Sequence, residues 1–296
     1  MASLKEVKTK IGSVKKTKQI TKAMSMVATS RLRGAQTSME AFRPYAKKFA
    51  EVLGSIADKA GDKASPLLTP REEVRKVHIV LLTSDRGLCG GFNFNLIEKA
   101  ETLMKEKVAQ GLEVSFTNFG KKGRDYCRNK GLKRATEYLN VVGGKFGFSI
   151  ASTAGQELIN GFLNGDFDEA YVIYSNFQGM ANQIPVIKQL LPIPAIEKSD
   201  VEKDEKTEFM AEHIIEPSPG ELLNEMLPKN IFIQIYNALL ETSTSEHAAR
   251  MKAMDNATKA CNDMIDNLTL AYNKARQTAI TMELMDIVGG AEALKG

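Results

Sequence analysis

Apolar residues recur at alternating spacings of three and four along the first 56 residues of the chain. Thirteen of the sixteen positions on this track are apolar, which sustains an a/d heptad pattern over more than seven heptads. Such a pattern is typical of a long helix that packs along one stripe against another helix. It predicts a helix over residues 3–57. The track comprises Leu4, Val7, Ile11, Val14, Lys18, Thr21, Ser25, Ala28, Leu32, Ala35, Met39, Phe42, Ala46, Phe49, Leu53 and Ile56.

A second long helix is predicted at the other end of the chain. Neither Gly nor Pro occurs between Lys229 and Val288. Pro228 suits the first turn of that helix, and Gly289 and Gly290 suit its end. Its apolar stripe runs through Met254, Ala257, Cys261, Met264, Leu268, Ala271, Ala275, Thr278, Met282 and Met285.

Each of these two helices has one apolar stripe and therefore needs a partner. Because the chain leaves along one helix and returns along the other, we expect them to pair with each other as a left-handed antiparallel coiled coil. The alternative is that each helix pairs with a second copy of the chain.

An α/β body is predicted between the helices. Residues 58–73 are rich in helix breakers and form a linker. Strands that alternate with helices indicate a mostly parallel, Rossmann-like sheet. The expected division is residues 1–57 for the N-terminal coiled-coil helix, 74–220 for the central α/β domain and 221–296 for the C-terminal coiled-coil helix. The expected strands are 77–82, 114–119, 170–174 and 184–191, and the expected helices are 95–109, 121–130 and 149–164. Residues 197–221 are expected to form an exposed hairpin or loop.

Composition is that of an ordinary globular chain, with 43% hydrophobic and 26% charged residues, but the charge is unevenly distributed. Residues 1–50 carry a net charge of +10 and the remainder −6. No apolar run approaches the ~18 residues that a membrane-spanning helix needs. The N-terminal stretch is basic and amphipathic like a mitochondrial transit peptide, yet its unbroken heptad pattern places it in the mature fold.

The glycine-rich stretch Ser84–Gly91 follows a predicted strand and precedes a helix, where doubly wound folds bind phosphates. It matches neither GxGxxG nor the P-loop pattern, because no Lys-Ser/Thr follows. We expect a structural turn in which Asp85 and Arg86 pair locally or with a neighbour. The scattered cysteines and histidines predict no metal site, and Cys89 has no His nearby in sequence to activate it as a nucleophile.

Two features of the helices indicate contacts beyond the helix pair. The stripe turns polar at Lys18, Thr21 and Ser25, while apolar residues such as Ile20 lie off it. Near the end of the second helix, residues 280–288 are apolar nearly all round, and one partner helix cannot cover such a surface. We expect other chains to supply an apolar sleeve. The basic face of the first helix suits acidic protein loops or nucleic acid, and the scarcity of aromatic residues favours the protein loops.

Three stretches carry a resemblance to a known family. Residues 11–14, 20–28 and 30–33 resemble the N-terminal helix of the gamma subunits of rotary F-type ATP synthases. Residues 84–93 are similar to the internal signature of that family, and residues 256–260, 272–277 and 280–291 resemble its C-terminal signature.

The resemblance implies a rotor shaft with no catalytic residue, cofactor or metal of its own. The coiled coil would pass through a ring of three alpha and three beta subunits, and the body would sit on the epsilon subunit and the membrane-embedded c-ring. Torque from proton flow would drive the conformational cycle of the ring. The residues expected to contact partners are Met24, Arg31, Arg33, Arg276, Gln277, Thr281, Leu284 and Ile287.

The resemblance also implies a bacterial chain, peripheral to the cytoplasmic face of the inner membrane, since no extra leader precedes the first helix. Arg31 stands where the family often has Lys, and no inserted cysteine pair of the chloroplast type is present. Two alternatives stay open on the residues alone. A nucleotide-binding enzyme that dimerises by its coiled coil would bind ATP or NAD, and a nucleic-acid-binding coiled coil would show affinity that falls steeply with salt.

Overall fold

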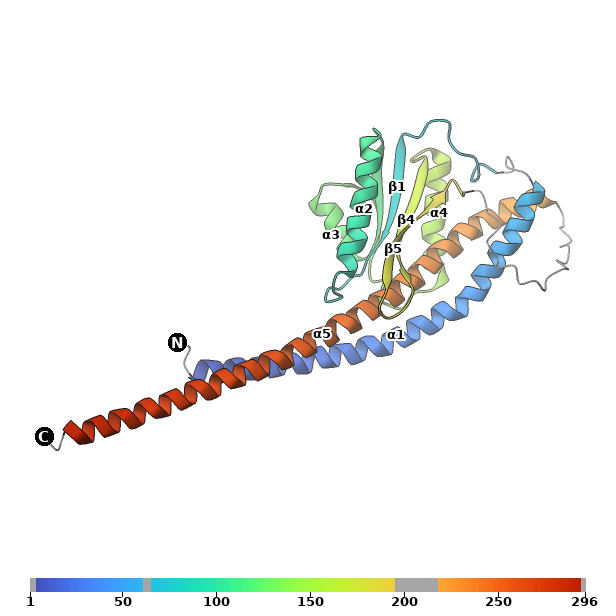
Figure 1. The fold of residues 1–296 in the computed structure, drawn as a ribbon. Coiled ribbons are helices and arrows are strands. Elements are labelled where there is room, and N and C mark those ends of the chain that lie inside the picture. Colours follow the sequence, from blue (N-terminus) through green and yellow to red (C-terminus); the bar gives the residue numbers. More distant parts are fainter. Residues whose placement is uncertain (1–3, 61–64, 195–217, 294–296) are drawn as a thin grey trace. The chain divides into compact units, whose positions relative to one another are not determined.

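The computed structural model describes residues 4–60, 65–194 and 218–293. These residues form two compact units: unit 1 contains the chain up to Thr29 together with the chain from Arg250, and unit 2 contains Ser30–Ala249. The elements, labelled in Figure 1, are the helices α1 (Leu4–Ala60), α2 (Phe92–Ala109), α3 (Lys121–Asn129), α4 (Phe148–Asn164) and α5 (Pro219–Ala293), and the strands β1 (Lys76–Leu82), β2 (Glu113–Phe119), β3 (Lys133–Tyr138), β4 (Glu169–Phe177) and β5 (Gln183–Leu191).

Helix α1 confirms the heptad prediction. All sixteen positions of the predicted stripe are buried or half-buried, including the polar residues Lys18, Thr21 and Ser25. Most positions between them are exposed, as the single-stripe pattern requires. The polar residues therefore lie in the stripe and do not mark a departure from it.

Helix α5 is longer at both ends than the sequence pattern predicted. It begins at Pro219, so Pro228 lies inside the helix and not in its first turn. A proline in a helix interior removes one backbone hydrogen bond, but Leu223 and Leu227 are fully buried and stabilise the added turns by packing. At the other end, Gly289 and Gly290 were expected to end the helix, yet it continues to Ala293. Glycine costs about 1 kcal/mol in a helix, which weakens a helix without necessarily ending it.

Contacts inside each unit show that α1 and α5 run antiparallel. In unit 1 the hydroxyl of Thr21 contacts that of Thr258, and Ser25, further along α1, hydrogen-bonds Asp255, which lies earlier on α5. In unit 2 the rings of Phe42 and Tyr236 meet edge to face with centroids 4.8 Å apart.

The α5 stripe departs from the predicted heptad after Cys261. Met264 is 49% exposed, while its neighbour Ile265 is half-buried. Further on, Tyr272 and Ala279 are half-buried, one residue later than the strict heptad places the stripe. An α-helix has 3.6 residues per turn, so its buried face drifts relative to a 3.5-residue repeat.

The sheet of unit 2 has the order β3-β2-β1-β4-β5. Strands β1, β2, β3 and β4 run parallel to one another, and β5 pairs antiparallel with β4. This confirms a mostly parallel, Rossmann-like sheet. Strand β3 was not predicted, because its sequence KRATEY is mostly polar and it lies at an edge of the sheet, where burial does not impose an apolar pattern. The predicted loop at 197–221 falls mostly outside the described residues.

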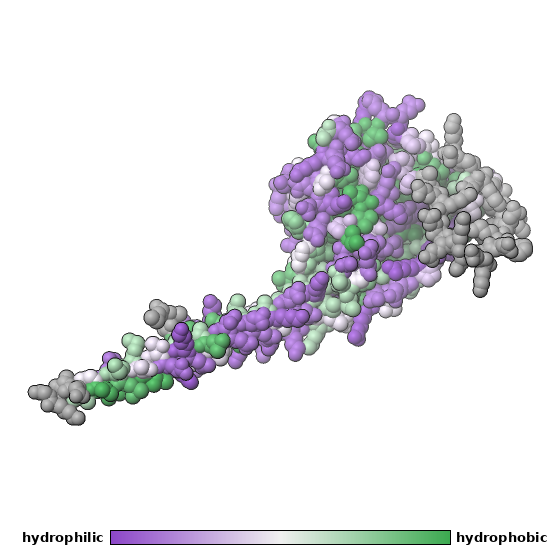
Figure 2. Space-filling model, viewed as in Figure 1, coloured by the Kyte–Doolittle hydropathy of each residue, from purple (hydrophilic) through white to green (hydrophobic). Residues whose placement is uncertain are grey.

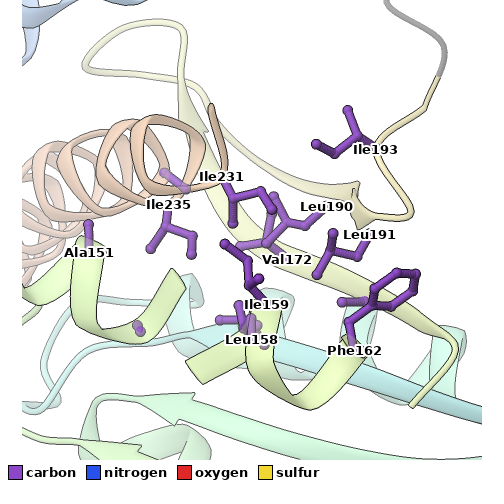
Figure 3. Packing of buried hydrophobic residues seen from close by; sticks show 14 of the residues in the cluster. Ala151, Leu158, Ile159, Phe162, Val172, Leu190, Leu191, Ile193, Ile231 and Ile235 are labelled. Atoms are coloured by element: carbon purple, nitrogen blue, oxygen red, sulfur yellow. The ribbon is translucent and has the colours of Figure 1, made fainter. Parts of the chain in front are cut away.

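Both faces of the sheet are covered. Val80 and Leu82 of β1 face a core made with α4, α5 and the end of α1, part of which is shown in Figure 3. Ile79 and Leu81, which alternate with them, face a second core made with α2 and α3. Helix α4 packs closely on α5 at Gly155, where a Cβ atom would lie 2.3 Å from the ring of Phe232.

Candidate partner interface

The last turns of α5 expose a band of large apolar side chains that covers several faces of the helix. Every residue from Ile280 to Ala291 is exposed, and Leu284 and Ile287 are 57% and 68% exposed. Figure 2 shows the apolar side chains gathered at this end of α5. We call this band the apolar tip; its large members are Ile280, Met282, Leu284, Met285, Ile287 and Val288.

The isolated chain exposes apolar residues on all sides of this helix end. Such a surface indicates that other protein chains surround it in the functional assembly. Soluble chains rarely display large contiguous apolar patches unless another molecule covers them. Within unit 1, α1 begins at Leu4, and the pairing of Thr21 with Thr258 brings Leu4 to the level of Ala275. The apolar tip, which begins at Ile280, therefore lies beyond the part of α5 that pairs with α1.

Three polar residues of the predicted contact set lie on α5 at the base of the apolar tip. Arg276, Gln277 and Thr281 are exposed. The hydroxyl of Thr281 donates to the backbone carbonyl of Gln277 at 2.9 Å, so it is satisfied within the helix. The guanidinium and amide groups offer hydrogen bonds on one helix surface, as recognition of a partner's carboxylates or carbonyls requires.

The predicted contact residues of α1 divide between the two units. Met24, in unit 1, is half-buried, whereas Arg31 and Arg33 belong to unit 2 and are exposed. Large apolar residues beside Met24 are also exposed: Ile20 is 60%, Met26 61% and Val27 55% exposed. These off-stripe residues do not contact the partner helix enough to be buried, which supports a role for this face in binding another chain.

The glycine-rich turn between β1 and α2 is held by its own side chains. Asn93 accepts a hydrogen bond from the backbone N–H of Ser84 at 2.9 Å, and its amide nitrogen lies 3.1 Å from the sulfur of Cys89. The hydroxyl of Ser84 donates to the carbonyl of Arg86 at 2.6 Å. Leu88 has a φ of +63° and is 63% exposed. The turn is thus a locally braced structure, as expected, with an exposed leucine at its summit.

Asp85 connects this turn to two other segments. Its Oδ1 accepts the backbone N–H of Lys121, at the start of α3, and that of Asn140, after β3. Gly120, which precedes α3, has a φ of +91°, and a Cβ atom there would lie 2.1 Å from the carbonyl oxygen of Thr83. The carboxyl ends of β1, β2 and β3 are therefore joined by contacts between loops.

The carboxyl edge of the sheet is also where α5 packs, and sequence reasoning missed the residues that do this. Thr242 accepts the backbone N–H of Ser175 on β4 at 3.3 Å, and Ser245 donates to the carbonyl of Ser175 at 3.3 Å. Glu246 is 2% exposed, and a Cβ atom added at Gly143 would lie 3.0 Å from its carboxylate. In doubly wound folds the ligand crevice lies at this edge of the sheet, and here Thr242 and Ser245 of α5 pack against it. The signal in the sequence is the run of small hydroxyl residues at 242–245.

Glu241 is a further buried charge on this stretch of α5. Its Oε1 accepts a hydrogen bond from Asn237 at 3.1 Å. Burial raises the pKa of the Glu241 carboxyl, and this effect outweighs the opposing influence of Asn237 and of the Arg43 and Lys188 cations. The residue therefore belongs to the packing between helices and sheet and not to an exposed surface.

The remaining candidates for chemistry are buried or dispersed. Cys89 is 2% exposed, which removes it from contact with a substrate. No group of three His, Cys, Asp or Glu side chains able to hold a metal ion occurs in the described part of the chain. Nor does any helix within these ranges have the length and apolar character needed to cross a bilayer.

A paired helical shaft with an uncovered apolar end, joined in one chain to a Rossmann-like body, defines an assembly subunit rather than a stand-alone enzyme. A family model described as ATP synthase matches residues 3–294. The ATP synthase gamma chain of Desulfosudis oleivorans is 70% identical over 298 residues, with all of both chains covered. That of Nitratidesulfovibrio vulgaris strain Hildenborough is 53% identical over 296 residues, again with full coverage of both. The chain belongs to the ATP synthase gamma chain family.

Solved structures agree on the fold. A chain from the rotor of the Euglena gracilis mitochondrial ATP synthase, in rotational state 1, is 20% identical and has a TM-score of 0.66, with 94% of this chain and 98% of that chain covered. A chain from the OSCP/F1/c-ring assembly of the same organism, in rotational state 3, is 18% identical with a TM-score of 0.67 and covers 98% of this chain and 94% of that one.

Proposed function

We propose that this chain is the central rotor shaft of a bacterial proton-translocating ATP synthase. The observation that carries the proposal is the apolar tip at the end of a paired helical shaft. An apolar surface on all sides of a helix fits a surrounding sleeve, and a sleeve without strong directional bonds permits rotation. The shaft would transmit torque between a membrane c-ring and a ring of three alpha and three beta subunits, and would not itself catalyse ATP synthesis or hydrolysis.

The predicted contact residues divide by chemistry. Leu284 and Ile287, on the apolar tip, would turn inside the sleeve. Arg276, Gln277 and Thr281, next to it, would make the polar contacts with the ring that change as the shaft turns. On α1, Met24 would add an apolar contact and Arg31 and Arg33 would meet acidic loops of the beta subunits.

The remaining partners are the epsilon subunit and the c-ring, which would hold the body of the shaft. Through them the chain would be peripheral to the cytoplasmic face of the bacterial inner membrane. Its exposed lysines on α1 suit the acidic loops of the ring better than they suit nucleic acid, because no aromatic residue accompanies them before Phe42.

Reconstitution with the alpha and beta subunits tests the proposal. We expect one copy of the chain to elute with three alpha and three beta subunits, and a bead attached to unit 2 to rotate when the immobilised complex is given ATP. The chain alone should show no ATPase activity, because it lacks a P-loop lysine. Turnover by the pure chain, or a stable ring that excludes it, would refute the assignment.

A further inference from the structure

Two polar contacts cross between α1 and α5 in unit 1, one helical turn apart. The hydroxyl oxygens of Thr21 and Thr258 are 2.8 Å apart, and the Ser25 hydroxyl donates to the Asp255 carboxylate. Thr21 is 9% and Ser25 7% exposed, so both hydroxyls are removed from water. We call these two contacts the polar layer.

The threonine hydroxyls are satisfied in either direction of the shared bond. Thr258 can donate to the carbonyl of Met254, 2.8 Å away, while it accepts from Thr21. In the reverse arrangement Thr21 donates to the carbonyl of Lys18, 3.1 Å away, while it accepts from Thr258. The polar layer therefore leaves no buried hydroxyl proton without an acceptor in either arrangement, and it costs little to bury.

The apolar residues around the polar layer do not define how far one helix is displaced along the other. Beside it the stripe has small side chains at Ala28 on α1 and at Ala257 and Cys261 on α5, and one flexible large side chain, that of Met254, which is 5% exposed. A displacement of one turn exchanges one small apolar contact for another. Polar residues at single stripe positions are the known means by which paired helices specify one register.

A displacement of α5 by three residues does not preserve both polar contacts. If α5 moved by three residues, Thr21 would face Cys261, which is a poor acceptor, and Ser25 would face Thr258. One of the two cross-helix hydrogen bonds would then be lost. We propose that the Thr21–Thr258 and Ser25–Asp255 contacts together fix the axial register of α1 and α5 in unit 1. The proposal concerns the helix pair alone and does not depend on rotation.

Disulfide trapping in the full-length chain measures the register. Extending the observed pairing by one heptad places Val14 opposite Ile265, so cysteines at these positions report the native offset. Cysteines at Val14 and Leu268 report a displacement of three residues, about 4.5 Å along the helix. The background carries Cys261→Ala, which removes the stripe thiol without adding a hydroxyl that could pair with Thr21 in the displaced register. Cys89 and Cys127 are buried in unit 2 and remain.

The decisive variant is Thr21→Val/Ser25→Ala, which removes both α1 hydroxyls while Thr258 keeps its bond to its own helix. We expect the ratio of native-offset to displaced disulfide to fall about fivefold, which is the preference that one net hydrogen bond supplies. The conservative exchange Thr21→Ser/Ser25→Thr should retain the original ratio. The matched control Ser13→Ala/Thr17→Val alters exposed hydroxyl residues on the same helix and should also leave it unchanged.

Three results would overturn the proposal: an unchanged ratio in Thr21→Val/Ser25→Ala, an equal fall in the control, or a fall in the conservative exchange. If circular dichroism shows that the double variant has lost its helices, Thr21→Val alone serves in its place. That variant must also lower the ratio of native-offset to displaced disulfide. Ser25 would hydrogen-bond Asp255 at the native offset and Thr258 at the displaced offset, so neither register would keep an advantage. An unchanged ratio there would count equally against the polar layer as the determinant of register.

Discussion

Asp85 holds the backbone of Asn140, 55 residues away in sequence, through a hydrogen bond of 3.0 Å from the Asn140 N–H to Oδ1. The same oxygen accepts the N–H of Lys121 at the start of α3. One carboxylate thus joins the turn after β1, the start of α3 and the loop after β3. The signature turn of the family is therefore part of a structural joint in the body.

Removing this carboxylate should destabilise unit 2. For Asp85→Ala we expect the free energy of unfolding to fall by about 1–3 kcal/mol, because two backbone N–H groups lose their acceptor. Asp85→Asn keeps one carbonyl oxygen at the same place and should cost less than half as much. Urea denaturation of the isolated chain, followed by circular dichroism, measures both. Equal stability of the alanine variant and the native chain would show that water replaces the carboxylate without loss.

His78 should make the stability of the body depend on pH. It is 2% exposed, its ring nitrogens lie 2.8 and 2.9 Å from the hydroxyls of Ser115 and Thr117, and its ring stacks on Phe167. Burial lowers the pKa of His78 from 6.5 to about 4. Between these pH values the unfolded chain binds a proton that the folded chain does not, so stability is full above pH 6.5 and falls as the pH drops toward 4.

This loss of stability reaches about 3 kcal/mol once the pH is below 4, at 1.36 kcal/mol for each unit by which the two pKa values differ. His78→Gln retains hydrogen-bonding groups but cannot titrate. We expect the variant to be less stable at pH 7 and to lose less stability than the native chain between pH 6.5 and 4.5. The free energy of unfolding is measured against pH by urea titration at fixed ionic strength. If it falls equally steeply for the two proteins across this range, groups other than His78 cause the acid sensitivity.

The sequence predicted those features that depend on repeated burial of apolar groups. The stripe of α1 was correct at every position, since all of its residues are buried or half-buried. The predicted start of α5 was wrong because packing at Leu223 and Leu227 outweighs the cost of Pro228 inside the helix. Its predicted end was wrong because a glycine weakens a helix without necessarily ending it. Strand β3 was missed because its side chains are mostly polar and exposed, so they leave no alternating apolar pattern, unlike those of β5 at the other edge.

Only part of the contact surface could be predicted from the sequence. Exposure of Leu284 and Ile287 follows from a helix that is apolar on all sides, and the sequence contains that pattern. The polar layer could be seen only as an interruption of the stripe, because the partners Thr258 and Asp255 lie more than 200 residues away and on the opposite helix. The close approach of the Glu246 carboxylate to the backbone at Gly143, where an added Cβ would lie 3.0 Å from it, gave no signal, since such closeness cannot be read from side-chain periodicity.

Arg276 and Gln277 provide a test of the polar ring contact. Both are exposed, so Arg276→Ala/Gln277→Ala should leave the thermal stability of the isolated chain within about 0.5 kcal/mol of the native value. In the assembled enzyme we expect slower ATP-driven proton pumping, because a charge-assisted hydrogen bond contributes about 1.5–3 kcal/mol. Thr278→Ala, an exposed neighbour whose hydroxyl donates to Lys274, is the control and should pump normally. Native pumping by the double variant would remove these two residues from the contact set.

The apolar tip should behave as a bearing, and Ile287 distinguishes a bearing from an exposed end. In the isolated chain Ile287 is 68% exposed, so neither Ile287→Ala nor Ile287→Asp should change its stability measurably.

In the complex the two variants should differ in the yield of assembled enzyme. Alanine removes apolar contact area, which reduces the yield of the complex modestly. Aspartate places an unpaired carboxylate in an apolar sleeve, which costs several kcal/mol by solvation and should prevent most of the assembly. Complex yield and ATP hydrolysis per complex, measured for both variants beside the native chain, check this order. Equal and native yields for alanine and aspartate would mean that water, and not protein, surrounds the end of α5 in the working enzyme.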